Sequence, residues 1–170
     1  MKKKKINPND YSGMIMDKIQ QGVLLTTKNG EKVNSMIIGW GAMGVNWGLP
    51  VFTAYVRESR YSRELLDKTG EFTINVPVGE IDKNIFKICA GKSGRDTDKI
   101  SEAGLTTVEP NVVSVPGIKE CPITLECKVL YRQKMEKELM DNEKVSKWYA
   151  DGNMHIAYYA EIVDAYIIED

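Results

Sequence analysis

The segment VNSMIIGWGAMGVNWGLPVFTAYVRESRYSR, residues 33–63, carries most of the information about fold and function in this sequence. Two runs rich in β-branched and aromatic residues, 35–38 and 51–56, are bounded by turn residues and are predicted to be strands. The second run is almost entirely apolar, which favours a strand buried on both faces. A loop rich in glycine and tryptophan is predicted to join the two strands.

The second strand leads into RESRYSR, residues 57–63, which has the composition of a helix start. Ser59 is predicted to cap a helix over about 60–68, ended by Gly70. The first turn of a helix has free backbone N–H groups and a partial positive charge. With three guanidiniums and two hydroxyls crowded there, the pattern predicts a phosphate-binding site.

A structural alternative remains open for the three arginines. Charge-rich helix starts often form only surface ion pairs. Arg57, Arg60 and Arg63 would then pair with nearby carboxylates of the same segment: Glu58, Glu64 and Asp67.

Two segments of this sequence partly match nucleotide-binding motifs, but neither meets the full requirements of its motif. Residues 39–44 match G-x-G-x-x-G, but that motif must open a helix, and no helix can run past Pro50. The glycines then form either an ordinary loop or a backbone that lies against a flat ligand. Gly91-Lys92-Ser93 lacks the earlier glycine of a phosphate-binding loop, because Phe86 stands at that position.

Length and composition set the class of protein. A chain of 170 residues with 42% hydrophobic and 28% charged residues is expected to be one soluble globular domain spanning 1–170. A net charge of −1 argues against a nucleic-acid binder. No apolar run approaches the roughly 20 residues that span a bilayer, so no membrane segment is expected.

Cysteine and histidine content excludes further kinds of site. Cys89, Cys121 and Cys127 are an odd number without a C-x-x-C pair, which favours reduced thiols and a cytoplasmic location. His155 is the only histidine, so neither a catalytic metal site nor a hydrolase triad is predicted.

The remaining segments are predicted from periodicity and turn residues. Residues 1–9, with lysines at 2–5, are expected to be flexible or to pack on a partner. Strands are predicted at 22–28, 31–38, 71–76, 123–131 and 155–168, with short extended segments at 105–108 and 112–115. Helices are predicted at 11–20, 82–90 and 97–103, a hairpin turn at Asn29-Gly30, and an exposed loop or short helix at 133–147. About six main strands with a few short helices indicate a mainly β fold, a closed or partly closed antiparallel barrel.

Beyond these patterns, the sequence resembles a known family. The matching pieces are NSMIIGWG and PVFTAYVRESRYSRELL in the first segment, EFTINVP from Glu71, GKSGRD from Gly91 with the pair Asp98-Lys99, and HIAYYAEI from His155. Together they resemble the flavoredoxin branch of the flavin-reductase-like family. The resemblance implies an FMN-binding split barrel of Greek-key antiparallel strands that forms homodimers, with the flavin near the subunit interface.

The resemblance also implies roles for individual residues. It places the cofactor phosphate near the Arg-x-Ser-Arg-Tyr-Ser motif and the loop lysine, Asn34 and Trp40 beside the flavin ring, and the histidine near the ring from the same or the neighbouring subunit. The predicted cofactor-binding residues are Asn34, Ser35, Met36, Trp40, Arg57, Ser59, Arg60, Ser62, Lys92 and His155. No catalytic residue is assigned, since the flavin carries the redox chemistry.

These observations lead to one function and two alternatives. The expected function is an FMN-dependent oxidoreductase, or an electron carrier, that receives hydride from transiently bound NADH or NADPH or electrons from a redox partner protein. The first alternative is a flavin reductase that supplies free reduced flavin to a partner. The second is a non-catalytic ligand-binding barrel.

Overall fold

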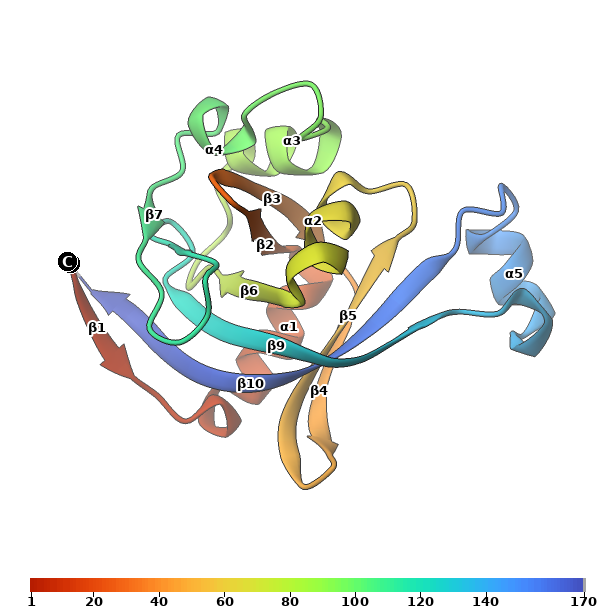
Figure 1. Cartoon of the computed structure of the whole chain (residues 1–170), viewed down its shortest axis with the longest axis horizontal. Coiled ribbons are helices and arrows are strands. Elements are labelled where there is room, and N and C mark those ends of the chain that lie inside the picture. Colours follow the sequence, from red (N-terminus) through yellow and green to blue (C-terminus); the bar gives the residue numbers. More distant parts are fainter. Residues whose placement is uncertain (170) are drawn as a thin grey trace.

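Eight strands form one antiparallel sheet that curls into a barrel, in a computed structural model that describes residues 1–169 (Figure 1). The strands of this sheet are β1 (Lys2–Lys5), β2 (Val23–Asn29), β3 (Lys32–Ile38), β4 (Gly41–Asn46), β5 (Leu49–Arg57), β6 (Glu71–Val76), β9 (Ile123–Lys134) and β10 (His155–Glu169). A separate short pair consists of β7 (Thr107–Val108) and β8 (Gly117–Ile118). The helices are α1 (Ser12–Gln21), α2 (Tyr61–Thr69), α3 (Lys83–Gly91), α4 (Lys99–Glu102) and α5 (Asn142–Trp148), with 3₁₀ turns at Pro8–Tyr11 and Lys137–Leu139.

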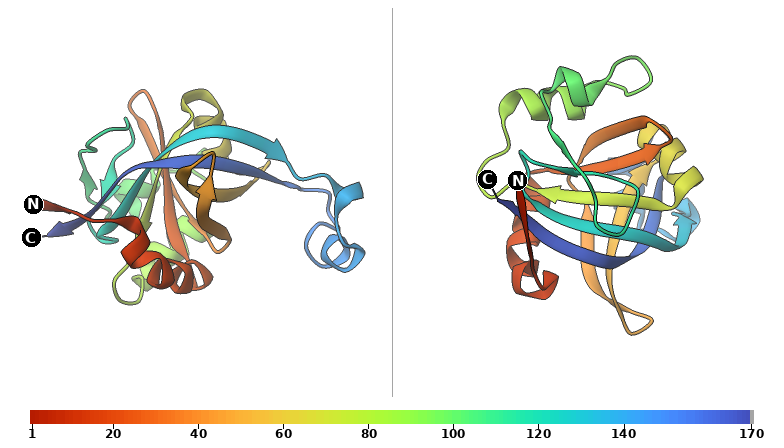
Figure 2. Two further views of the ribbon diagram at one scale, coloured as in Figure 1. Left: turned by 90° about the horizontal axis from the view of Figure 1, so that it is seen from below. Right: turned by 60° about the vertical axis from the view of Figure 1, so that its left-hand side comes forward.

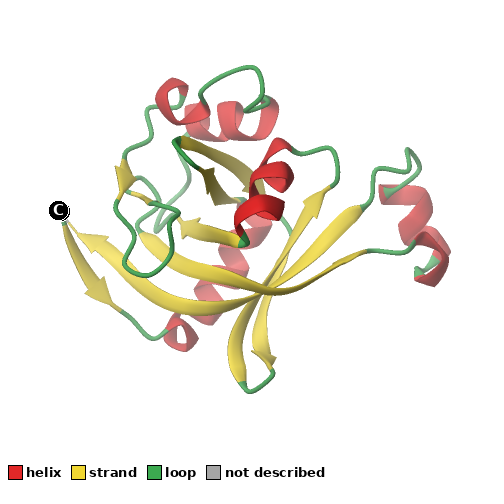
Figure 3. Ribbon diagram, viewed as in Figure 1, coloured by secondary structure: helices red, strands yellow, loops and turns green. Residues whose placement is uncertain are grey.

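The strand order is β3-β2-β6-β9-β10-β5-β4, with β1 added on β10. β6, β9 and β10 lie side by side, and β5, which precedes them in the chain, lies beside β10. This is the Greek-key arrangement predicted from the resemblance. The helices lie outside the strands, as Figure 3 shows, and α2 packs on β2 while α3 and α4 pack on β3.

A buried polar cluster lies on the face of the sheet opposite the apolar core of the barrel. The core includes Phe52, Phe72 and Leu125, all fully buried. On the opposite face the hydroxyls of Thr26 and Ser35 lie 2.6 Å apart, and the side-chain amide of Asn75 donates to Thr26 over 3.1 Å. Each of these polar groups therefore has a partner, which removes most of the cost of burying it.

The predicted glycine-tryptophan loop is a strand instead. Residues 41–46 form β4, which pairs with β5 from Gly41 opposite Ala54 to Asn46 opposite Leu49. The hairpin turn is made by Trp47 and Gly48, both with positive φ (52° and 70°). Such a turn favours Asn or Gly at both positions, so the tryptophan at position 47 does not match the sequence pattern of a hairpin turn.

The N-terminal segment is ordered, contrary to the expectation that residues 1–9 are flexible or rest on a partner. Lys2–Lys5 pairs antiparallel with the C-terminal half of β10, from Lys2 opposite Glu169 to Lys5 opposite Tyr166. Figure 2 shows the two ends of the chain lying close together in both views. The pairing is between segments far apart in sequence, which local patterns do not reveal.

Most helix and strand boundaries agree with the predictions to within a few residues, and the exceptions have local causes. The 29–32 hairpin turns at Gly30 (φ 58°) and Glu31 rather than at Asn29 and Gly30. Of the two short extended segments, 105–108 contains β7, whereas 112–115 is a series of bends that leads to β8, the partner of β7. The β9–β10 connection, residues 135–154, contains α5 and projects from the barrel in Figure 1; we call it the arm.

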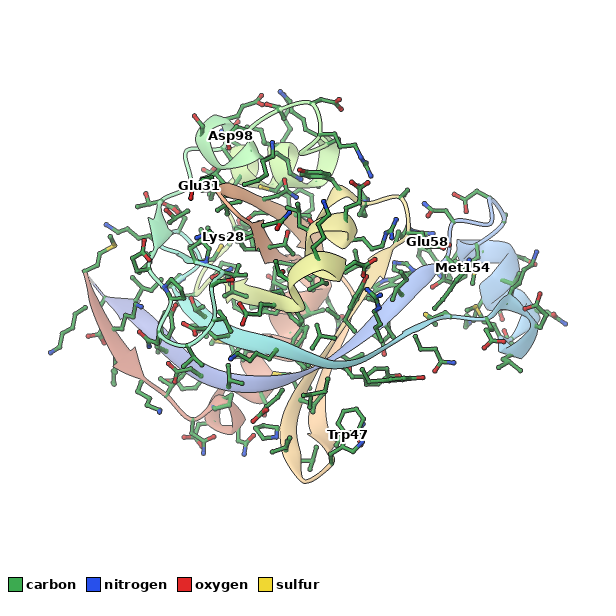
Figure 4. The ribbon with its side chains drawn as sticks, viewed as in Figure 1. Lys28, Glu31, Trp47, Glu58, Asp98 and Met154 are labelled. Carbon is green, nitrogen blue, oxygen red and sulfur yellow. The ribbon has the colours of Figure 1, made fainter. Side chains whose placement is uncertain are left out.

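Helix α2 starts one residue later than predicted. Arg60 is the N-cap residue and makes no side-chain capping bond, so Ser59 lies just outside the helix. Gly70 ends the helix in the left-handed conformation, as predicted. The start of α2 is held to the arm, since the backbone N–H of Glu58 donates to the carbonyl of Met154 over 3.0 Å (Figure 4).

Candidate functional site

Two adjoining cavities lie at the start of α2 and share Met36 and Arg60. The first, which we call the polar cavity, has a volume of about 180 Å³ and is lined by Asn34, Met36, Ser59, Arg60, Tyr61, Ser62, Lys99 and the loop 91–95. The second, the aromatic cavity, measures about 170 Å³ and is lined by Met36, Ile37, Ile38, Gly39, Trp40, Tyr55, Arg57, Arg60, Trp148 and His155. Nine of the ten residues predicted to bind a cofactor line one cavity or both.

Ser35 is the predicted residue that lines neither cavity. Successive side chains of a strand point to opposite faces, so Asn34 and Met36 face the cavities while Ser35 points to the other face of the sheet. There its hydroxyl pairs with Thr26 and is fully buried. Its side chain therefore lies away from both cavities, and its role in binding stays a prediction.

The polar cavity contains two cations without carboxylate partners. Within residues 1–169 the guanidinium of Arg60 forms neither an ion pair nor a hydrogen bond. Lys99 is 3% exposed and donates to the backbone carbonyls of Cys89 (3.0 Å) and Lys92 (3.2 Å). A lysine ammonium has three N–H donors, so one N–H of Lys99 remains available to another group.

Burial lowers the pKa of the Lys99 ammonium, and the nearby charge of Arg60 lowers it further. The first effect arises because the buried ammonium is not solvated by water, and the second because two like charges repel each other. A bound anion would remove this penalty, since it stabilises the charged form of both groups.

Hydrogen-bond donors at the start of α2 complete the polar cavity. Asn34 donates from Nδ2 to the hydroxyl oxygen of Ser62 over 2.8 Å, which leaves the hydroxyl hydrogen of Ser62 free to be donated. The first N–H groups of α2 have no partner within the helix. Loop 91–95 closes the cavity, and a Cβ on Gly94 would come within 2.1 Å of Asn34 Oδ1.

The arginines of residues 57–63 separate into three environments. Arg63 follows the surface-pair alternative, donating to Asp67 over 2.9 Å. Arg57 donates instead to the backbone carbonyls of Asn153 and Trp148 in the arm, over 2.6 and 3.0 Å. Arg60 alone of the three is left to bind an external group.

The carboxylates expected to pair with Arg57 and Arg60 have other partners. Glu58 forms an ion pair with Lys134 at 3.0 Å, and Glu64 pairs with Arg95. The hydrogen bond from Arg95 lowers the pKa of Glu64. No carboxylate lines either cavity.

The loop lysine predicted at the site has a different neighbourhood from the one expected. Lys92 lines the polar cavity, but its ammonium pairs with Glu102 of α4, whose pKa is lowered by that hydrogen bond. Lys99 takes the buried position beside Arg60. The pair Asp98-Lys99 belongs to the resemblance, yet nothing in its local pattern distinguishes a buried lysine from an exposed one.

Ser59 is held outside the helix by the arm. Its hydroxyl accepts from the side-chain amide of Asn153 over 2.8 Å, and its backbone N–H donates to Asn153 Oδ1 over 3.3 Å. Arg95 Nη1 donates to the carbonyl of Ser59 over 3.1 Å. The arm and the 91–95 loop thus fix both sides of the α2 start.

The aromatic cavity is built around His155 and Trp40. Their ring centroids lie 4.7 Å apart, and Trp148 of the arm meets Trp40 edge-on at 5.1 Å. His155 Nδ1 lies 2.8 Å from the hydroxyl of Tyr149. Burial, with the charges of Arg57 and Arg60, lowers the pKa of His155 to about 4, so its ring is neutral near pH 7.

Taken together, the two cavities suit one elongated ligand. The polar cavity offers unpaired cations and hydroxyl and N–H donors for a phosphate group. The aromatic cavity, reached past Met36 and Arg60, offers flat apolar surfaces for a ring system.

The comparison with protein families identifies the class more closely. Residues 16–170 match the flavin reductase like domain, and the chain belongs to that family. It is similar to an uncharacterized protein of Archaeoglobus fulgidus, with 37% identity over 101 residues that cover 59% of this chain. The chain spans 55% of the length of that relative.

Solved structures agree with this membership. The fold is similar to flavoredoxin from Methanosarcina acetivorans, with a TM-score of 0.66, 26% identity and coverage of 87% of this chain and 68% of the other. It is also similar to an FMN-binding domain of a flavin reductases-like enzyme from Shewanella baltica, with a TM-score of 0.67, 16% identity and coverage of 98% and 77%. The family and the split-barrel fold predicted from the sequence are confirmed.

Two kinds of feature are absent from residues 1–169. No helix there is long and apolar enough to cross a membrane. No group of three or more histidine, cysteine, aspartate or glutamate side chains in that range is placed to hold a metal ion.

Proposed function

We propose that this protein binds FMN in the two adjoining cavities and acts as a flavin-dependent oxidoreductase or electron carrier. The observation that carries the proposal is the pair of unpaired cations, Arg60 and Lys99, in a cavity continuous with an aromatic one. FMN has a phosphate at one end and a flat ring system at the other. The Shewanella baltica protein that shares this fold is an FMN-binding domain.

The residues present fit this cofactor. Arg60, Lys99, the Ser62 hydroxyl and the first N–H groups of α2 would hold the phosphate, while Met36, Trp40 and the neutral ring of His155 would border the flavin ring. When bound, FMN supplies a ring that accepts hydride or electrons at N5. The chain's own task is to position that ring, neutralise the phosphate and limit access of water.

The donor and the molecular context are further parts of the proposal. Because the chain has no dinucleotide-binding motif, NADH or NADPH would bind transiently beside the flavin, unless a redox partner protein delivers the electrons. A homodimer is supported by exposed apolar side chains, among them Val45 on β4, Trp47 in the β4–β5 turn and Leu130 on β9. Three buried, unpaired cysteines favour the cytoplasm.

Titration of the flavin-free chain with FMN, followed by quenching of flavin fluorescence, tests the proposal. We expect a dissociation constant in the micromolar range or tighter, and weaker binding of riboflavin, which lacks the phosphate. No binding at about 100 µM FMN would overturn the proposal. Gel filtration after saturation then separates a prosthetic group, which co-elutes, from a dissociable substrate of a flavin reductase.

A further inference from the structure

A third cavity lies on the other side of Trp40, between helix α1 and the arm. We call it the arm cavity, and its volume is about 480 Å³. Pockets that enclose drug-sized molecules typically measure about 300–1,000 Å³. The arm cavity is therefore large enough to enclose a small organic molecule in addition to anything bound in the polar and aromatic cavities.

Its lining is aromatic and sulfur-rich. The residues are Met16, Ile19, Gln20, Gly39, Trp40, Gly41, Tyr55, Met135, Met140, Lys144, Trp148 and Tyr149. Methionine side chains adapt to ligand shape and make favourable contacts with aromatic rings. Trp40, Trp148 and Met16 are 37%, 42% and 40% exposed, so these large apolar side chains face open space rather than the core.

The arm cavity and the aromatic cavity have a common wall. Gly39, Trp40, Tyr55 and Trp148 line both. Trp40 meets Trp148 edge-on and lies against His155, so these rings stand between the two spaces. A molecule in the arm cavity would thus lie next to the ring end of the candidate cofactor site.

The charge at the cavity selects one kind of ligand. Lys144 is the charged residue in the lining, and no carboxylate lines it. Its ammonium is 3.6 Å from Glu143, and both side chains are more than half exposed, so this pair is weak. Lys144 is therefore available to an anionic group at the cavity mouth.

We propose that the arm cavity binds a flat aromatic molecule that carries one anionic group, such as an aromatic carboxylate. The ring lies among the methionines and aromatic side chains, and the anion is paired with Lys144. Its role as a second-substrate site rests on the proposed function, because it depends on flavin in the neighbouring cavity. The binding itself does not depend on flavin.

Quenching of tryptophan fluorescence by 2-naphthoate tests this proposal, with neutral 2-naphthalenemethanol as the comparison ligand. Both are titrated into the full chain, with and without FMN. We expect saturable binding of naphthoate below about 1 mM, with the neutral compound binding more weakly. Lys144→Gln should weaken naphthoate about fivefold and leave the neutral compound unchanged.

Two further variants locate the binding. Lys137→Gln removes an exposed lysine of the same arm that does not line the cavity, so its affinity for naphthoate should equal that of the parent chain. Met140→Asp places a carboxylate in the lining and should weaken naphthoate at least tenfold while FMN affinity is retained. Thermal unfolding verifies that each variant is folded.

Several results would overturn the proposal. The first is the absence of saturable quenching by naphthoate, and the second is equal affinity for the two compounds. The others are equal effects of Lys144→Gln and Lys137→Gln, and unchanged naphthoate binding in Met140→Asp. A shift in oligomeric state caused by Met140→Asp, without naphthoate binding to the parent chain, would assign the cavity to a second copy of the chain. Naphthoate binding to a chain that fails to bind FMN would refute the proposed function alone.

Discussion

Asn34 and Ser62 are joined by a buried hydrogen bond of 2.8 Å that links strand β3 to the first turn of helix α2. Both side chains are almost fully buried, at 2% and 1% exposure. The bond connects the two elements that form the floor of the polar cavity. It also orients the Ser62 hydroxyl, because that oxygen accepts from Asn34 and its hydrogen must point elsewhere.

Replacing Asn34 by leucine removes the donor of this bond and leaves the Ser62 hydroxyl without its partner. We expect the free energy of unfolding to fall by about 1–3 kcal/mol, the usual cost of a broken buried hydrogen bond. Urea denaturation of Asn34→Leu, Ser62→Ala and the double variant measures the coupling between the two residues. Strictly additive losses would contradict a direct bond.

Arg60 and Arg63 provide a matched pair for the phosphate site. Arg60→Gln removes the unpaired guanidinium and should weaken FMN binding about tenfold to a hundredfold, as expected for a charged hydrogen bond. Arg63→Gln removes a guanidinium already bound to Asp67 and should change the affinity less than about twofold. Riboflavin affinity should be the same in both variants. A loss in Arg63→Gln as large as in Arg60→Gln would contradict this assignment.

Gly94 and Gly91 form a second matched pair, in the loop that closes the polar cavity. A Cβ at position 94 would lie 2.1 Å from Asn34 Oδ1 and 2.8 Å from the Tyr61 ring, whereas one at position 91 meets nothing within 4 Å. Gly94→Ala should therefore destabilise the chain by about 1–3 kcal/mol and weaken FMN binding. Gly91→Ala should do neither. Thermal unfolding and FMN titration measure both, and equal behaviour of the two variants would refute the close packing.

His155 gives a prediction for pH. Its pKa is lowered from 6.5 to about 4 by burial and by Arg57 and Arg60, so protonation is disfavoured in the folded state. Above pH 6.5 the histidine is neutral in both states and its contribution to stability is fully present. As pH falls from 6.5 towards 4, only the unfolded chain gains the proton, and stability should drop by up to about 3 kcal/mol.

Because the chain has one histidine, NMR titration of its ring protons measures this pKa without assignment. Urea unfolding at about pH 7 and about pH 4.5 measures the linked change in stability. His155→Gln cannot titrate, so its stability should depend less on pH over this range. A histidine that titrates near 6.5 in the folded protein would contradict the buried, cation-flanked position.

The sequence predicted the parts of the site that depend on local order along the chain. Residues 57–63 include the start of helix α2, and a helix start rich in arginine is recognisable from composition alone. Which arginine stays unpaired was not predictable, because the partners of Glu58 and Glu64 are Lys134 and Arg95, far away in sequence. Pairing between residues far apart in sequence determines which arginine stays unpaired, and local sequence patterns carry no information about that pairing.

Three other differences between prediction and structure concern Ser35, strand β4 and Lys99. The side chains of three consecutive strand residues cannot all face one cavity. Alternation alone therefore predicts that the Ser35 side chain points away from the cavities. Strand β4 could not be recognised in the same way, because its turn uses Trp47 at positive φ and its residues are mostly glycine or exposed. The burial of Lys99 depends on the fold of the 91–98 loop, which no periodicity describes.

The pairing of Lys2–Lys5 with β10 has a consequence for the behaviour of the protein at high concentration. Without that strand, the unpaired backbone groups of residues 166–169 would offer a template on which extended segments of other chains could add. With it, the new outermost edge consists of four lysines, whose like charges repel another copy. The basic N-terminal strand thereby opposes edge-to-edge aggregation of the barrel.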